Sequence, residues 1–301
     1  MTKIPLKRAV SAGLLALGAM LLFSAPAAAA ARLTVESGGV SRSALVVLRD
    51  RLKLHRRPLI IVLRRDGGIH QRRHHGLEEA AESSKPIFVY PETESGSWPT
   101  APGPAADREL LFLNDLTARV MKEAAVDPRK IYIVGVSSGG AFAYRAACAG
   151  FGHPLAGLAT LISAMPDDLA NCAPKAPVAY IAVSGAADPR IPFGGGPTTL
   201  PDASFSALPA ETTLAAFAKA ASCGARKEEK PIADRDPHDG SKAFILSYAG
   251  CKAPVELIRV DGGGHAIPGR KLEKQFEASG GQNNDFDAYR AIWDFLKRNG
   301  A

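Results

Sequence analysis

The chain has 301 residues, of which 46% are hydrophobic and 22% are charged. It is therefore long and apolar enough for a large folded core and does not have a disordered composition. The formal net charge of +7 falls to about +4 when three basic residues near the N-terminus are set aside, an excess too small to indicate a nucleic-acid partner.

The N-terminus has the pattern of a secretory signal peptide. Three basic residues among the first eight precede an apolar run from Ala9 to Phe23, which is followed by the small residues SAPAAAA. The run is too short for a comfortable membrane span, so we expect no stable membrane anchor. The pattern predicts a signal peptide over 1–30, cleaved between Ala28 and Ala31, and a secreted or periplasmic domain over 31–301.

The first half of the mature chain alternates apolar runs with helical segments. It predicts strands at Ser43–Arg49, Pro58–Leu63 and Ile87–Tyr90, a short helix at Leu77–Glu82, a helix capped by Asp107 and running to about Ala125, and a strand from Ile131 that turns into a helix at Ala141–Ala149. The residues VDPRK are expected to form the turn before that strand.

The second half continues the same alternation. It predicts strands at Leu158–Ile162, Val178–Ser184, Ala243–Tyr248 and Val255–Val260, helices at Glu211–Ala221 and Asp285–Lys297, irregular chain at 189–210 and a polar surface excursion at 224–242. Strands that alternate with helices indicate an α/β fold with a mainly parallel, doubly wound sheet flanked by helices.

The segment Gly135-Val136-Ser137-Ser138-Gly139 matches the G-x-S-x-G pattern of a nucleophile elbow. A β-branched and aromatic strand precedes it and a helix-forming stretch follows, which is the context that such an elbow requires. The alternative is a glycine-rich turn with incidental serines. In the elbow interpretation Ser137 is the nucleophile.

An elbow serine needs a histidine base and an acid, which follow it in the order Ser, Asp, His in this kind of fold. Of seven histidines, only His265 follows both a strand and a glycine-rich loop late in the chain. Asp188 ends the strand PVAYIAVSG and is the favoured acid, although an aspartate before proline is also a common turn residue. The weaker competitors for the acid are Asp261, Asp167 and Asp168.

Four cysteines in an exported chain predict two disulfides. Three pairings can be drawn, and proximity in sequence suggests Cys148–Cys172 and Cys223–Cys251. Four buried free thiols are the alternative. No C-x-x-C pair exists, so we expect no metal site built on these cysteines.

Three ordered motifs, IYIVGVSSGGAFAYRAAC, VSGAADPRIPFGGG and VELIRVDGGGHAIPG, together resemble the polyhydroxybutyrate depolymerase and feruloyl esterase family of secreted α/β-hydrolases. The resemblance extends to VYPETESGSWP, VDPRKIY and FDAYRAIWDFLKRNG, and so covers most of the mature chain. It implies an α/β-hydrolase fold. No domain boundary is evident in the sequence, so we expect a single domain, and the predicted serine chemistry requires no cofactor. The resemblance also implies that Ser137, Asp188 and His265 are nucleophile, acid and base, and it favours the pair Cys223–Cys251.

The sequence departs from this family in the region of the oxyanion hole. Arg64 and Arg65 occupy the positions where the family has His-Gly. The backbone N–H of Asp66, the next residue, is expected to face the oxyanion, and Gly67 or Gly68 would supply the N–H if the loop shifts by one residue. The backbone N–H of Ser138 is the other predicted donor. Losing one such donor costs about 2.7–4 kcal/mol in the transition state.

A second departure lies beside the predicted base. Ile267 stands where the family commonly has tryptophan, which leaves Trp98 as the aromatic candidate for the cleft wall. Ordinary loop packing is the alternative interpretation of Trp98.

The stretch His70–His75, HQRRHH, carries an unusual density of positive charge. His70 and His74 have a spacing that could bind a metal on a helix, but a solvated cationic loop is favoured and no metal is predicted. A third interpretation is that the stretch attracts anionic substrates or cell-envelope polymers to the cleft.

We therefore predict an exported serine esterase acting on hydroxyalkanoate oligomers or on aryl, acetyl or feruloyl-type esters. The predicted partner is a small or oligomeric ester, and the sequence does not define the oligomeric state. The alternatives are a peptidase on the same fold and a binding protein with a degraded oxyanion hole.

Overall fold

The computed structural model describes residues 29–48, 55–64, 76–172, 174, 176–201, 203–270 and 280–301. Most of the predicted signal peptide lies outside this set, as do Arg65, Asp66 and the stretch His70–His75. The first strand begins at Ala29, so the expected cleavage range overlaps its first residues.

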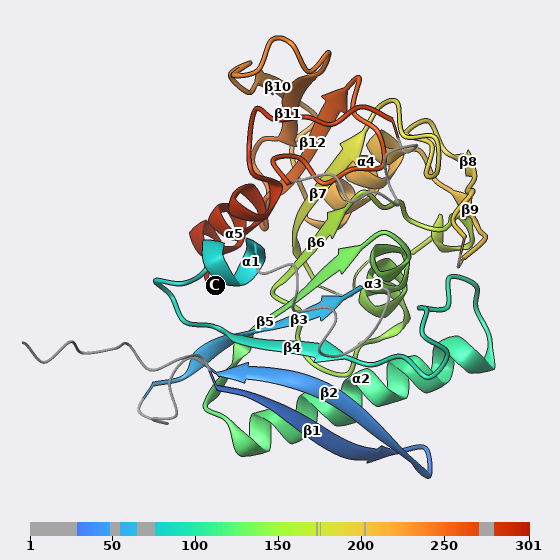
Figure 1. The fold of residues 1–301 in the computed structure, drawn as a ribbon, viewed down its shortest axis with the longest axis vertical. Coiled ribbons are helices and arrows are strands. Elements are labelled where there is room, and N and C mark those ends of the chain that lie inside the picture. The colour runs from blue at the N-terminus through green and yellow to red at the C-terminus, as the bar shows by residue number, and fades with distance from the viewer. Residues whose placement is uncertain are drawn as a thin grey trace, which may run out of the picture.

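Ten strands form one twisted sheet in the order β1-β2-β4-β3-β5-β6-β7-β12-β11-β10 (Figure 1). The six central strands, β4-β3-β5-β6-β7-β12, pair in parallel with one another. At one edge β1 and β2, and at the other β11 and β10, pair antiparallel with their neighbours. Their bounds are β1 Ala29–Ser37, β2 Val40–Leu48, β3 Arg57–Leu63, β4 Ile87–Pro91, β5 Val126–Val136, β6 Gly157–Leu161, β7 Ala179–Gly185, β10 Lys227–Pro231, β11 Lys242–Tyr248 and β12 Val255–Asp261.

Helices cover both faces of the sheet and bury a hydrophobic core on each side. One core contains side chains from α2, α3 and α4, and the other contains side chains from α1 and α5, which lie side by side in Figure 1. Their bounds are α1 Gly76–Ala80, α2 Pro104–Glu123, α3 Ser138–Ala149, α4 Ala210–Ala220 and α5 Ala288–Arg298. This arrangement is the predicted α/β-hydrolase fold, which is therefore confirmed.

Two helices that were expected to begin at aspartates begin elsewhere. Helix α2 starts at Pro104, so Asp107 lies in its first turn instead of capping it. Proline is well suited to that first position because its missing N–H would have no partner within the helix. Helix α5 starts at Ala288 and is capped by Asp287, while Asp285 accepts backbone N–H groups from another loop.

Three strand predictions also need correction. Strand β1 was not predicted, and VDPRK extends β5 back to Val126 instead of forming a turn. The supposed excursion at 224–242 contains β10, with the sequence KEEKP, at the edge of the sheet. Charged residues and proline are typical of protected edge strands. Residues 189–210 are mostly irregular, as expected, apart from the two-stranded ladder of β8 (Gly196–Pro197) and β9 (Ser206–Ala207).

A buried ion pair joins the antiparallel edge of the sheet to α2. Arg42 Nη2 donates to both carboxylate oxygens of Glu109, at 3.0 and 2.8 Å. Both residues are buried. The guanidinium also lies 4.1 Å from the centre of the Phe112 ring. Removing one partner of such a pair is costly because the other charge stays buried without compensation.

Replacing Glu109 with glutamine is expected to lower the free energy of unfolding by about 3 kcal/mol, because the amide no longer neutralises Arg42. Urea denaturation measures the change. The control is Glu123→Gln in the same helix, whose exposed pair with Arg119 should contribute less than about 0.5 kcal/mol. Equal losses in the two variants would contradict this account of the buried pair.

Candidate active site

Ser137 lies at the sharp turn between β5 and α3. Its backbone angles are φ 54° and ψ −125°, a strained conformation that costs a non-glycine residue about 1–3 kcal/mol. The flanking glycine is required by close packing, since a Cβ on Gly139 would lie 2.2 Å from the carbonyl oxygen of Leu63. The expected strand–turn–helix is therefore present, and its serine is held in the strained position.

His265 reaches the serine from the loop after β12. Its Nε2 lies 3.0 Å from Ser137 Oγ, and the imidazole is only 1% exposed. Gly185, the last residue of β7, lets this loop pack tightly against the end of the strand, because a Cβ on Gly185 would lie 2.4 Å from the carbonyl oxygen of Gly263. The glycine-rich loop therefore places the imidazole over the elbow.

Asp188 holds the other side of the imidazole. Its Oδ2 lies 2.8 Å from His265 Nδ1, and its Oδ1 accepts the backbone N–H groups of Arg190 and Ile191 at 2.8 and 3.0 Å. Asp188 can therefore be both a turn residue and the partner of the histidine, since Oδ1 stabilises the turn and Oδ2 contacts the imidazole.

The competing carboxylates are engaged elsewhere. Asp261 pairs with Arg259 at 2.7 Å, Asp168 pairs with Arg145 at 2.9 Å, and Asp167 is exposed at the start of a short 3-10 helix. Asp188, in contrast, contacts His265 Nδ1 directly.

Together the three side chains form a hydrogen-bonded chain at the carboxyl edge of the parallel strands. The Asp188 carboxylate fixes a proton on Nδ1, so Nε2 is the acceptor that faces the serine hydroxyl. These three hydrogen-bonded side chains can move a proton from Ser137 Oγ to the imidazole while the carboxylate stabilises the charged ring.

Of the two predicted oxyanion donors, the structure describes one. Ser138 is fully buried at the first position of α3, where backbone N–H groups point out of the helix end. Asp66 lies outside the described residues. Arg64, two residues before Asp66, is held on two sides. Its carbonyl accepts the Trp98 indole N–H at 2.8 Å, and its guanidinium donates to the Tyr289 hydroxyl at 2.7 Å.

The two cleft candidates differ in exposure. Trp98 is 1% exposed and stacks on Phe142 of α3 with ring centres 4.9 Å apart. It therefore packs in the core, which agrees with the interpretation of Trp98 as a packing residue. It also borders a cavity of about 350 Å³ formed by the 95–105 loop and residues 203–204. Ile267 is half-buried beside the α5 core. Their contact with substrate stays a prediction.

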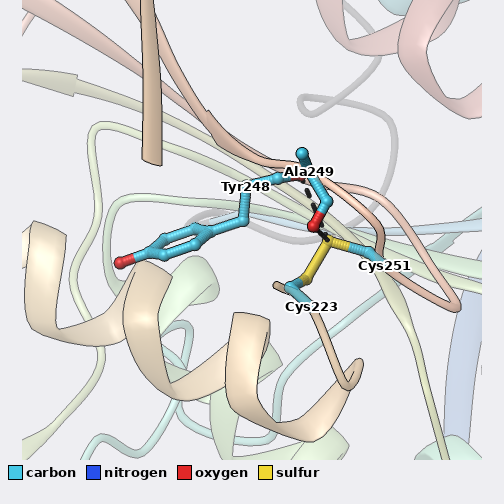
Figure 2. The surroundings of a disulfide bond; sticks show 4 residues. All are labelled: Cys223, Tyr248, Ala249 and Cys251. Carbon is cyan, nitrogen blue, oxygen red and sulfur yellow. Dashed lines mark hydrogen bonds between the residues drawn. A yellow bond between two sulfur atoms is a disulfide. The ribbon is translucent and has the colours of Figure 1, made fainter. Parts of the chain in front are cut away.

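The four cysteines form two disulfides between sequence neighbours. Cys148 at the end of α3 pairs with Cys172. Cys223 follows α4 and pairs with Cys251 in the turn between β11 and β12 (Figure 2).

Within the described part of the chain, no cluster of three or more His, Cys, Asp or Glu side chains is arranged to hold a metal ion. No helix in that part is long and apolar enough to cross a membrane.

Several residues that support the elbow were not predicted from the sequence. The hydroxyl of Tyr144, which lies on the elbow helix α3, is 2.9 Å from Oγ1 of Thr160 on β6 and 2.7 Å from the hydroxyl of Tyr180 on β7. Burial raises the pKa of Tyr144 to about 12, so this cluster is neutral at ordinary pH. Ser163 donates to the Ser137 carbonyl at 2.8 Å. These residues are scattered in sequence, and no motif marks them.

Sequence comparison finds relatives among esterases, although no family model matches the chain. The chain is 29% identical over 261 residues to "Putative esterase NocK" of Nocardia uniformis subsp. tsuyamanensis, covering 80% of this chain and 74% of that protein. It is 27% identical over 198 residues to "Feruloyl esterase C" of Emericella nidulans, covering 64% of this chain. This match spans 62% of that enzyme, which is less than two thirds of its length.

Solved structures with a similar arrangement include a ferulic acid esterase, which is 16% identical with a TM-score of 0.42 and matches 54% of this chain and 80% of that one. A thermostable esterase is 17% identical with a TM-score of 0.44 and matches 54% of this chain and 48% of that one. The resemblance to feruloyl esterases is confirmed by the sequence relatives. With the fold, these relatives identify the chain as a carboxylic ester hydrolase of the α/β-hydrolase fold.

Proposed function

We propose that the protein is an exported serine esterase in which Ser137 is the nucleophile, His265 the general base and Asp188 the residue that orients the base. The observation that carries this proposal is the continuous hydrogen-bonded chain, with 3.0 Å from Ser137 Oγ to Nε2 and 2.8 Å from Nδ1 to Asp188 Oδ2. The strained backbone of Ser137 supports it, because strain of this kind gathers at functional residues.

In the proposed acylation, Nε2 of His265 takes the Ser137 proton as Oγ attacks the ester carbonyl carbon. The carbonyl oxygen becomes an oxyanion, for which the backbone N–H groups of Ser138 and Asp66 are the proposed donors. The bond to the alcohol oxygen then breaks, and the alcohol leaves with the proton from His265. A water molecule that gives its proton to Nε2 next hydrolyses the acyl-enzyme, and Ser137 recovers its proton as the acid leaves.

The steps use only side chains, backbone N–H groups and water, so we propose no cofactor. The proposed substrates are hydroxyalkanoate oligomers or aryl and acetyl esters of the feruloyl type. The resemblance to polyhydroxybutyrate depolymerases stays a prediction. Export is supported by the signal-peptide pattern of residues 1–30 and by the two disulfides.

We expect the purified protein to hydrolyse p-nitrophenyl acetate and butyrate much faster than the matching p-nitroanilides, because p-nitrophenolate can leave as the anion, whereas the anilide nitrogen must be protonated by the histidine as it leaves. Release of nitrophenol and nitroaniline under identical conditions measures the ratio. Faster cleavage of the anilides would favour the peptidase alternative. Absence of turnover with both series would favour the binding protein with a degraded oxyanion hole.

A further inference from the structure

The two edges of the ten-stranded sheet differ in how they are protected against pairing with another strand. At one edge β10 is five residues long and consists of KEEKP, with four charges and a proline. At the other edge β1 is nine residues long, AAARLTVES, with no proline, glycine or lysine. Its register with β2 runs from Ala29 to Ser37 without a β-bulge. Proteins commonly protect an edge strand by such features, and β1 has few of them.

The outer side of β1 presents backbone groups that can pair with a further strand. Within the described residues, β2 is the only strand that pairs with β1. Figure 1 shows β1 along the edge of the sheet, with α2 beside it, and the two elements are in contact. In an antiparallel pair, alternate residues direct their N–H and C=O groups away from the partner strand. An extended segment that pairs with these groups would lengthen the sheet.

The side chains of β1 restrict which segment can pair with it. Arg32, Thr34 and Glu36 are exposed on one face of the strand. Leu33 is half-buried and Val35 is buried on the other face, in the core that α2 covers. A partner strand must also place apolar side chains on the α2 face, because a shift of one residue would carry them to the polar face.

The sequence of β1 is complementary to itself in one register. When two copies of β1 pair antiparallel about a two-fold axis at Thr34, Leu33 of each copy lies opposite Val35 of the other on the α2 face. On the polar face, Arg32 of each copy lies opposite Glu36 of the other, at the spacing at which cross-strand ion pairs form. Centring the pairing on Arg32 or on Glu36 would instead place like charges opposite each other.

We propose that the outer edge of β1 binds the same edge of a second copy of this chain, forming a two-fold symmetric dimer with one continuous sheet. The assembly closes at two copies because the contact uses the β1 edge of both, while the β10 edges are protected. The complementary segment 32–36 follows the predicted cleavage range, Ala28 to Ala31, so export retains it. The inference concerns assembly and does not depend on the proposed esterase activity.

The surroundings of β1 support a contact there. The Arg32 side chain is 64% exposed although it pairs with Glu92, and its five N–H donors allow it to bind a second carboxylate. Leu111 of α2, a large hydrophobic residue, is 44% exposed. It lies beside the β1–β2 turn, since a Cβ on Gly38 would be 3.5 Å from its Cδ2 atom. The proposed register brings Ala30 of the second copy next to Gly38, where it would partly cover Leu111.

Charge reversal in the purified, exported protein tests the contact. Sedimentation equilibrium should show a dimer for the wild type. Glu36→Arg places its new arginine opposite Arg32 of the other copy, so we expect the dissociation constant to rise about 10- to 100-fold. The control is Glu228→Arg, which makes the same charge change on β10 at the opposite edge and should dimerise as the wild type does. Circular dichroism and the melting temperature establish that each variant is folded.

Mixing two variants tests the register itself. Arg32→Glu chains carry two glutamates at the β1 edge and Glu36→Arg chains carry two arginines, so each should be monomeric alone and the mixture should form heterodimers. The double variant Arg32→Glu/Glu36→Arg restores opposite charges and should dimerise again. If Arg32→Glu unfolds because it faces Glu92, the comparison of Glu36→Arg with Glu228→Arg still decides.

The opposite results would overturn the proposal. A wild-type protein that stays monomeric at high micromolar concentration has no such contact. A dimer that Glu36→Arg leaves as tight as the wild type uses another surface. Folded single variants that fail to associate on mixing exclude the register centred on Thr34, and assemblies larger than a dimer exclude the closed two-fold arrangement.

Discussion

Replacing Ser137 with alanine is expected to lower kcat for p-nitrophenyl acetate by about 10⁶-fold, because no other group in the chain of hydrogen bonds can form the acyl-enzyme. The fold should be retained, because the substitution removes one hydroxyl group, whose partner is His265 Nε2, and leaves the backbone hydrogen bonds of the elbow in place. Steady-state kinetics and the melting temperature of the same samples measure both quantities.

The adjacent serine provides a matched control. Ser138→Ala removes a hydroxyl group but keeps the backbone N–H that we propose as an oxyanion donor, so this variant should keep most of the activity. A Ser137→Ala protein that hydrolyses the ester as fast as the wild type would rule out the proposed nucleophile.

Replacing Asp188 with asparagine is expected to lower kcat by about 10⁴-fold. An asparagine can present its amide N–H to His265 Nδ1, which favours the tautomer with the proton on Nε2, and that nitrogen can no longer accept the Ser137 proton. The turn should survive because an amide oxygen can still accept the N–H groups of Arg190 and Ile191.

The control for this variant is Asp167→Asn, which changes an exposed carboxylate that was an early competitor for the acid. We expect its kcat to stay at the wild-type level and the melting temperatures of both variants to stay close to that of the wild type. Equal kcat in Asp188→Asn and the wild type would show that Asp188 does not orient the base.

The sequence was informative where a local pattern determines the local structure. Gly139 is needed because the backbone of β3 leaves no room for a Cβ, so the elbow motif marks a real steric constraint. Asp188 and His265 could be selected because the carboxyl ends of parallel strands meet at one edge, and each residue follows such a strand.

The sequence-based predictions failed where pairing with a strand distant in sequence determines the local structure. Strand β10 consists of KEEKP, which has no apolar pattern, and it is a strand because β11 offers it a free edge. The segment VDPRK joins β5 by pairing with β3 at Val126, although Asp and Pro favour turns. The hydrogen bonds that connect Tyr144, Thr160 and Tyr180 depend on the packing of α3 against β6 and β7, which no single motif encodes.

The central claim is that Ser137 is an activated nucleophile, and covalent labelling tests it most directly. Incubation of the wild-type protein with a fluorophosphonate, followed by peptide mass mapping, should show one phosphonyl group per chain on the peptide that contains Ser137. This result is expected because an attacking Oγ activated by His265 displaces fluoride from phosphorus. An unlabelled protein, or a label on a different serine, would contradict the account.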